Sequence, residues 1–338
     1  MSHRAWRPKS GRGMLVLLTA AVLSLSAAAC SSSSASSGAS ATSSAPGTGL
    51  TEKNVVVAAV PATGATGLYI AEQRGLFAAA GLHVTIEPSI SAADVVPDLL
   101  NGSVNVSLGQ WTSALAVEAR GIQLRAIATG NSGGPSLENL VTAANSPIKT
   151  LSALRGKTIA VNALAGLSQL LTESVLAGAG VSANQVRFVV IPFPSMGAAL
   201  ARHQVDAAFM VQPYLGQVLA AHQAASLADI DQGATANFPI TGYVVTTAWA
   251  KKNPATLAAF TRALAEGQKL AATDRAAVNE AIVHYISITP QTAAKMVLGG
   301  FPLTVDPSQL QRVAALMQQY GMLGKSVNVG SLVSAMTQ

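Results

Sequence analysis

The chain contains 338 residues, of which half are apolar and 11% are charged, and its net charge is +6. Four of the 21 Lys and Arg residues lie in the first twelve positions, so the rest of the chain has a net charge of only +2 and no basic run longer than two residues. This balance excludes an electrostatic surface for nucleic acid, and the apolar share predicts a large core divided between two domains.

The first 29 residues are predicted to be an export signal. Positions 1–12 are basic without an acidic residue, the run 13–29 is apolar, and small residues precede Cys30. These are the three parts of a secretory signal peptide. The apolar run is shorter than the ~20 residues that a membrane-spanning helix needs, which makes a transmembrane anchor the weaker alternative.

Cys30 is the only cysteine, so an intramolecular disulfide is excluded. Its position directly after small residues resembles the bacterial lipobox, in which the cysteine is lipidated, although Ala27 replaces the usual Leu. The composition of 30–50, rich in Ser, Ala, Thr and Gly, predicts a flexible linker. We therefore expect an exported lipoprotein anchored to the outer face of the cell membrane. An ordinary cleavage site beside an incidental cysteine is the alternative.

The body of the chain is predicted to begin with an apolar strand at 55–60, a run typical of a strand buried on both faces. Strands and helices alternate from there, which predicts an α/β fold with right-handed crossovers. The predicted elements of this first half are strands 55–60, 82–86 and 104–108 and helices 68–80 and 92–100.

The same plan recurs about 100 residues later, which predicts two lobes of similar construction. The elements of this second half are predicted to be strands 157–161, 186–191 and 205–211 and helices 166–177 and 195–201. The remainder is predicted to contain strand 243–247 and helices 254–272, 274–286, 291–298 and 307–320. Asp306 is the expected N-cap of the last of these, because Pro307 suits the first helical position.

A family resemblance runs through this body. The segment 68–77, followed by Gly81-Leu82-His83-Val84, resembles the opening of the nitrate, sulfonate, taurine and thiamine-precursor binding proteins, whose pattern is Leu-Tyr-x-Ala, polar residues, Gly-x-Phe and then Gly-Leu-x-Val. Three later segments resemble further landmarks of the family in the same order: 151–161, 205–214 and 249–254. The resemblance implies a periplasmic-binding-protein-like fold of type II, with two α/β lobes, a ligand cleft and two crossing segments.

The resemblance also implies boundaries and partners. Lobe I would comprise 51–144 and 240–338, lobe II would comprise 145–239, and the crossing segments would lie near 142–147 and 236–242. The protein would bind a small organic or oxyanion solute, such as a sulfonate, nitrate, taurine or a pyrimidine-like compound, by hinge closure. It would deliver the solute to an ABC permease in the membrane, and we expect a monomer.

Ligands of open α/β sheets bind beyond the carboxyl ends of the strands, which here selects five loops. These loops contain no Lys, Arg, Asp or Glu, and they are 61–67, 109–113, 130–134, 162–166 and 212–214. They predict a neutral, zwitterionic or helix-dipole-held solute, oriented by polar groups and packed against aromatic rings. The candidate ligand-binding residues are Thr63, Thr66, Gly67, Gln110, Trp111, Thr112, Asn131, Asn162, Gly166, Ser168, Gln212 and Tyr214.

Each candidate also has a purely structural alternative. Trp111 and Tyr214 could be packing residues, Asn162 could cap the helix that follows it, and turn threonines commonly bond to the backbone. Gln212 stands where the family often has Glu.

An enzymatic function is the main alternative to solute binding. The segment 130–134 satisfies G-x-S-x-G, the nucleophile-elbow pattern, but Pro135 follows at once and no helical pattern begins there. An exported, lipid-anchored hydrolase using Ser132 is therefore the second hypothesis, and a ligand-presenting sensor subunit is the third. The histidines are scattered and form no metal-binding motif, so we expect a binding protein with no metal and no cofactor.

Overall fold

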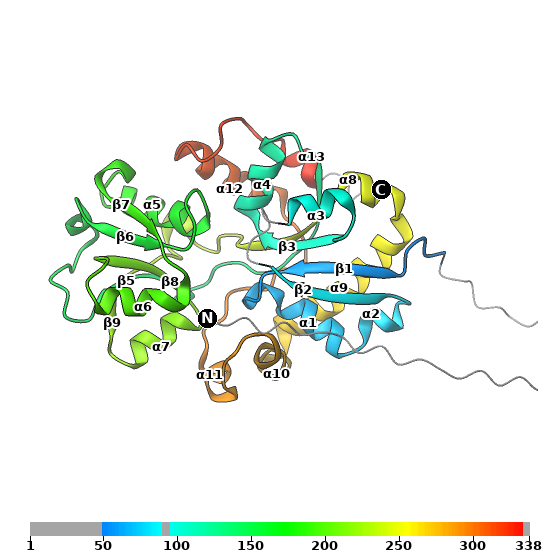
Figure 1. The fold of residues 1–338 in the computed structure, drawn as a ribbon, viewed down its shortest axis with the longest axis horizontal. Helices are drawn as coiled ribbons and strands as arrows, with labels where there is room; N and C mark the ends of the chain where they lie inside the picture. The colour runs from blue at the N-terminus through cyan, green and yellow to red at the C-terminus, as the bar shows by residue number, and fades with distance from the viewer. Residues whose placement is uncertain (1–48, 90–94, 334–338) are drawn as a thin grey trace, which may run out of the picture. The chain divides into compact units, whose positions relative to one another are not determined.

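The computed structural model describes residues 49–89 and 95–333. The predicted export signal, Cys30 and nearly all of the predicted linker lie outside the described residues. The described chain forms two five-stranded sheets, with strand orders β2-β1-β3-β10-β4 and β7-β6-β8-β5-β9 (Figure 1). This confirms the predicted α/β architecture. Within the described ranges, no helix is both long and apolar enough to span a bilayer.

The first sheet combines parallel strands with one antiparallel strand. Strand β1 pairs in parallel with β2 and β3, whereas β10 runs antiparallel between β3 and β4. All six residues of β10 are buried, and the strand has a neighbour on each side, so it is an interior strand of the sheet and part of its core. The strands are β1 (Asn54–Ala59), β2 (His83–Pro88), β3 (Val106–Gln110), β4 (Leu124–Thr129) and β10 (Thr241–Thr246).

Helices from both ends of the described chain surround this sheet. The predicted helix 68–80 is divided into two, because Gly75 adopts a left-handed conformation with φ 68° between α1 and α2. The helices are η1 (Thr63–Ala65), α1 (Thr66–Gln73), α2 (Leu76–Ala79), α3 (Val96–Asn101), α4 (Trp111–Ala119), α8 (Thr247–Lys252), α9 (Pro254–Thr273), α10 (Arg275–Tyr285), α11 (Pro290–Lys295), α12 (Pro307–Gln319) and α13 (Val329–Val333). Asp306 caps α12 by accepting the N–H of Ser308 at 2.8 Å, as predicted.

The second sheet repeats the plan of the first. Strands β6, β7 and β8 are parallel, and β5 runs antiparallel between β8 and β9. Its strands are β5 (Glu138–Ala143), β6 (Thr158–Val161), β7 (Arg187–Val190), β8 (Ala207–Val211) and β9 (Ala224–Asp229). Its helices are η2 (Leu151–Leu154), α5 (Leu167–Gly178), η3 (Ala183–Gln185), α6 (Phe193–Ala201), α7 (Tyr214–Ala220) and η4 (Gly233–Thr235).

The position of β5 corrects one prediction about the crossing segments. Because β5 belongs to the second sheet, the chain first passes between the sheets in 130–137, and the predicted crossing at 142–147 is wrong. The strand begins with Glu138 and Asn139, two polar residues that are nevertheless buried. Because of them the sequence lacks the apolar run that would have predicted a buried strand here. The return passage lies between the end of β9 and the start of β10, and it overlaps the predicted segment 236–242.

Two apolar clusters position the elements that surround the strand ends. In the first, Phe77 stacks on Phe260 with ring centroids 5.1 Å apart, which joins α2 to α9 beside the first sheet. The second cluster includes Trp111 of α4, Leu310 of α12 and Leu170 of α5. Each fully buried side chain of this size contributes ~1.5–3 kcal/mol. Helix α12 therefore packs against helices of both sheets.

Candidate functional site

The candidate residues gather at the carboxyl ends of the parallel strands, as the topology requires. In the first sheet, β1 and β3 end beside each other, and β4 ends at the same side of the sheet on the far side of β10, whose first residue, Thr241, pairs with Gln110 at the end of β3. In the second sheet, β6 and β8 are neighbours and end at Val161 and Val211. The five predicted loops therefore form two groups, one at the carboxyl edge of each sheet.

A buried hydrogen-bond network joins three segments at the first edge. Thr241 Oγ1 donates to Asn131 Oδ1 at 2.6 Å, the Asn131 backbone N–H donates to Thr241 Oγ1 at 3.1 Å, and Asn131 Nδ2 donates to Thr63 Oγ1 at 3.3 Å. A Cβ on Gly64 would overlap the Thr241 hydroxyl, so the network also requires this glycine. The side chains of Thr63 and Asn131 thus hold the loops together. Thr241 was not predicted, because no sequence pattern links it to Asn131.

Thr66 and Gly67, the first residues of α1, also contact other parts of the chain. Thr66 Oγ1 donates to the Thr63 carbonyl at 2.7 Å and hydrogen-bonds with the Tyr285 hydroxyl at 2.8 Å. Gly67 packs against Gln268 of α9, where a Cβ would overlap the side-chain amide. Gln268 Nε2 in turn donates to the carbonyl of Gly130. These contacts fix the first turn of α1 at the strand ends.

Trp111 and Thr112 retain polar atoms without partners. No loop separates β3 from α4, since Gln110 is both the last residue of the strand and the N-cap of the helix. The Trp111 ring packs over Gly242 of β10. Within the described part of the chain, Trp111 Nε1 and Thr112 Oγ1 are buried and form no hydrogen bond. An unpaired buried polar group costs ~1–3 kcal/mol, so these two atoms retain unused hydrogen-bonding capacity, as does Gln268 Oε1 beside Gly67.

At the second edge, the loop after β6 leads into α5. The Asn162 backbone N–H donates to Ser168 Oγ at 3.3 Å, so the Ser168 hydroxyl, which is buried, closes this loop. Gly166 is the N-cap of α5 in an extended conformation, and the helix has 12 residues. Its first N–H groups carry the positive end of the helix dipole. Asn162 Oδ1 is buried without a hydrogen bond to any described residue.

Gln212 and Tyr214 follow β8 on either side of a cis peptide bond to Pro213. Both side chains are half-buried. The Tyr214 ring stacks on Phe193, the first residue of α6, with centroids 6.5 Å apart. Gln212 Oε1 lies close to Gly216, where an added Cβ would be 2.9 Å from it. Phe193 was not among the predicted residues, although its position just after a parallel strand is a usable signal.

A cluster of acidic groups lies where the two crossing segments meet. Asp231 Oδ2 accepts the N–H of Gly134 at 2.7 Å. Burial is the main cause that raises the pKa of Glu138 to about 8, with a contribution from the charges of Asp231 and Asp229. Burial also raises the pKa of Asp231 to about 6, against the lowering effect of the Gly134 N–H. No spacing motif connects these residues, so this cluster could not be predicted from the sequence.

Arg312 of α12 lies beside this acidic cluster. It donates to the carbonyls of Ala236 at 2.6 Å and Ala234 at 3.2 Å, and its guanidinium lies 5.1 Å from the centre of the Phe238 ring. Its charge lowers the pKa of Asp231, as a smaller effect than burial. Helix α12 therefore holds the return passage by hydrogen bonds as well as by its apolar face.

The Gly-rich segment 130–134 does not form a nucleophile elbow. Ser132 makes bridges to Pro239 and Gly300, and the chain continues into β5, so the strand–turn–helix geometry is not formed here. Its hydroxyl donates to the Gly133 carbonyl at 3.4 Å. Among the residues that the structure describes, no group of three or more His, Cys, Asp and Glu side chains could hold a metal ion.

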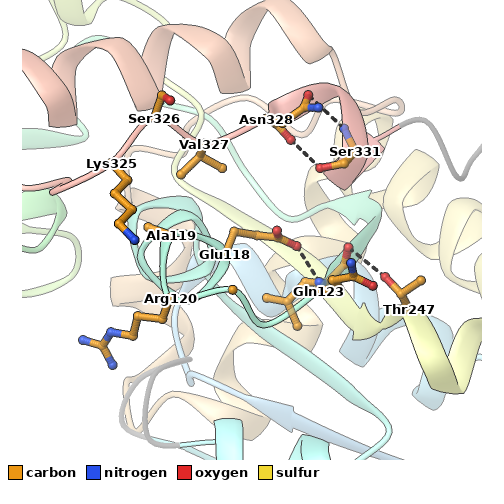
Figure 2. A pocket seen from close by; sticks show the side chains of 12 residues that line it. Glu118, Ala119, Arg120, Gln123, Thr247, Lys325, Ser326, Val327, Asn328 and Ser331 are labelled. Atoms are coloured by element: carbon orange, nitrogen blue, oxygen red, sulfur yellow. Dashed lines mark hydrogen bonds between the residues drawn. The ribbon is translucent and has the colours of Figure 1, made fainter.

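A pocket of about 550 Å³ lies away from these edges. Figure 2 shows it between the end of α4, the start of β4 and the segment 325–331. Glu118 lies in its wall and accepts the N–H of Leu124 at 2.5 Å, while Arg120 and Lys325 are exposed at its side. Burial raises the pKa of Glu118. Because the pocket borders the start of β4 and none of the twelve candidates lines it, it is separate from the predicted site.

Comparisons with known proteins agree with this arrangement. A family model described as "NMT1/THI5 like" matches residues 62–277. No curated protein matches the chain. Among solved structures, the periplasmic aliphatic sulphonate binding protein SsuA from Escherichia coli is 18% identical with a TM-score of 0.70, and 83% of this chain and 97% of that chain are covered.

Two further structures are similar over nearly the same share of the chain. The periplasmic nitrate-binding protein NrtA from Synechocystis PCC 6803 is 14% identical with a TM-score of 0.71, covering 85% of this chain and 86% of that one. The ligand-binding component of an ABC-type import system from Staphylococcus aureus, with zinc bound, has the same identity and TM-score and covers 85% and 99%. At these identities the likeness shows the fold, which is the predicted periplasmic-binding-protein fold.

Proposed function

The chain belongs to the NMT1/THI5-like family, and on this basis we propose that it is an extracytoplasmic solute-binding protein of an ABC-type importer. The observation that carries the proposal is the extent of the family match, 62–277, which includes strands of both sheets. The names of the similar structures, which describe sulphonate binding, nitrate binding and import, support it further. A solute that contacts both lobes only when they are closed would shift the population towards the closed form, which a membrane permease then receives.

The proposed site divides ten of the twelve candidates into two roles. Thr63, Thr66, Asn131 and Ser168 have protein partners for their side chains and shape the loops. The groups proposed to contact the solute are the ones with free hydrogen-bonding capacity or ring surface, namely those of Trp111, Thr112, Asn162, Gln212 and Tyr214, together with the N–H groups that follow Gly166. None of these side chains is charged, which supports a neutral, zwitterionic or dipole-held solute.

A thermal-shift screen tests the proposal. We expect a rise in melting temperature with at least one of taurine, an alkanesulfonate, nitrate, a pyrimidine or a small aromatic acid, because a ligand at about 100 times its Kd adds ~2.7 kcal/mol to the free energy of unfolding. Gln212→Ala is expected to abolish the shift, whereas Gln217→Ala, at an exposed residue of the helix α7 that follows, is the matched control. A shift that Gln212→Ala leaves intact, or a hydrolytic activity that Ser132→Ala abolishes, would contradict the proposal.

We also propose that Cys30 is lipidated and anchors the protein to the outer face of the membrane, on the evidence of its sequence position. Acyl chains anchor by burying CH₂ groups, at ~0.8 kcal/mol each. Cys30→Ser is therefore expected to move the protein from the membrane fraction to the soluble exported fraction and to abolish its labelling by a fatty-acid probe. Ser31→Ala is the control. Membrane association that is equal in both variants would show that Cys30 is not the anchor.

A further inference from the structure

The carboxyl edge of the second sheet carries apolar side chains that the fold leaves exposed. Leu164, in the loop after β6, is 57% exposed, and Val190, the last residue of β7, is 54% exposed. The two strands are neighbours, with Val161 paired to Val190, so both side chains belong to the same stretch of edge. A single exposed Leu or Val is ordinary on a protein surface. Two of them at the ends of adjacent strands, on the edge where α/β proteins bind ligands, indicate a binding surface.

Two aromatic rings follow the two strands that flank β6. Phe193 begins α6 directly beyond β7, and Tyr214 begins α7 beyond β8, the other neighbour of β6. The rings stack with an interplanar angle of 20°, and both are half-buried. Each segment that follows these three adjacent parallel strands therefore supplies large apolar or aromatic side chains. We refer to Leu164, Val190, Phe193 and Tyr214 together as the apolar edge.

The charged residues of these strands lie at the opposite end. Lys157 and Asp206 pair at 3.8 Å at the amino ends of β6 and β8, and Arg187 begins β7. By contrast, no Lys, Arg, Asp or Glu occurs in the segments at the carboxyl ends, which are 162–166, 191–195 and 212–216. An inorganic anion placed against the apolar edge would lose hydration without a cation in these segments to replace it. The N-terminus of α5 supplies only about half a unit charge.

We infer that the apolar edge receives the hydrocarbon body of an organic solute, aromatic or branched aliphatic, so that the site selects organic solutes over inorganic oxyanions. This inference rests on the proposed solute-binding function and narrows its ligand. Contact with the edge removes apolar surface of both partners from water, which is favourable in proportion to the area buried. The uncharged amides of Asn162 and Gln212, in the same loops, orient the polar end of the solute.

Matched pairs of small molecules test this preference on the full chain without its export signal. Calorimetric titration would compare methanesulfonate with benzenesulfonate and acetamide with benzamide, and would include nitrate. We expect at least one aromatic member to bind at least about tenfold more tightly than its methyl counterpart, because burying a ring adds apolar area at constant headgroup. Nitrate or methanesulfonate binding as tightly as benzenesulfonate would overturn the inference and leave the proposed function standing. Absence of binding by all five would overturn the inference, and absence of any response in the thermal-shift screen as well would overturn the proposed function.

A double variant, Leu164→Ser with Val190→Ser, locates the effect. Both side chains are exposed, so the variant is expected to fold, and the aromatic probe that binds best should bind about tenfold more weakly to it. Leu100→Ser, at a residue of α3 that is exposed to a similar degree, is the control and should bind the probe normally. Unchanged probe binding in the double variant would overturn the inference. Loss of solute uptake by cells with unchanged probe binding would show instead that the edge contacts the permease, and would also overturn it.

Discussion

Gly267→Ala is expected to lower the free energy of unfolding by about 3 kcal/mol, the upper end of the cost that is typical for an overpacked core. Gly267 lies where α9 crosses α1, and an added Cβ would overlap the carbonyl oxygen of Gly67 and lie 2.8 Å from the Cβ of Ala71. Helix propensity alone predicts the opposite sign, a gain of about 0.5–1 kcal/mol for Gly→Ala inside a helix. The cost of steric overlap exceeds this gain, because the added Cβ meets mainly backbone atoms of α1, which cannot rotate away as a flexible side chain could.

A second helical glycine provides the control for this prediction. Gly178, at the end of α5, has open space where a Cβ would be added, so Gly178→Ala is expected to be neutral or slightly stabilising. Urea unfolding of both variants measures the difference. Solute binding should weaken together with stability in Gly267→Ala, since α1 carries Thr66 and Gly67. Equal stability of the two variants would show that α1 and α9 do not approach as closely as described.

Glu138→Gln is expected to remove a large part of the pH dependence of stability. The pKa of Glu138 is raised from 4.5 to about 8, chiefly by burial. The folded protein therefore keeps a proton that the unfolded chain releases above pH 4.5, and the free energy of unfolding falls as the pH rises from about 4.5 to about 8. Each pH unit corresponds to about 1.4 kcal/mol, so the loss by pH 9 is on the order of a few kcal/mol.

The glutamine variant should match the wild type near pH 4.5 and exceed it in stability at pH 9, since the neutral amide has no proton to lose. Unfolding by urea at pH 5, 7 and 9 measures this difference. Asp231, whose pKa is raised to about 6, adds a smaller slope of the same sign between pH 4 and 6 that remains in the variant. Glu87→Gln, at an exposed residue of β2, is the control and should keep the wild-type profile. A wild-type protein that gains stability between pH 5 and 8 would contradict the burial of Glu138.

Most strands and most helices could be predicted because each has a local signature. Strands such as β1 and β6 are apolar runs, and α12 has its own cap in Asp306. Strand β5 escaped prediction because its first two residues are polar, and only the surrounding protein makes them buried. Strands β4 and β9 were also missed, and β9 contains three alanines with weak patterning.

The positions of the candidate loops could be predicted from the sequence, but the partners of their side chains could not. The rule that ligands bind at the carboxyl ends of strands needs only the order of elements, and the loops lie where it places them. The partners of the side chains depend on residues far away in sequence: Asn131 bonds with Thr241, and Thr66 bonds with Tyr285. Such pairs leave no pattern in a single sequence. For this reason the sequence did not distinguish residues that shape the loops from residues with free polar groups.

Strand β10 belongs to the first sheet although it comes after all strands of the second sheet in sequence, and this limits the order in which the two sheets can form. All strands of the second sheet lie within 138–229, whereas β4 sits at the edge of the first sheet with β10 as its neighbour. During synthesis from the N-terminus, the second sheet can therefore be completed as soon as residue 229 is present. Strand β4 gains its neighbour β10 only when residue 246 is present. The half that begins the sequence is thus assembled last. In the complete chain, β4 also pairs with a strand much farther away in sequence than β6 does, so during refolding we expect hydrogen-exchange protection in β6 and β8 before it appears in β4.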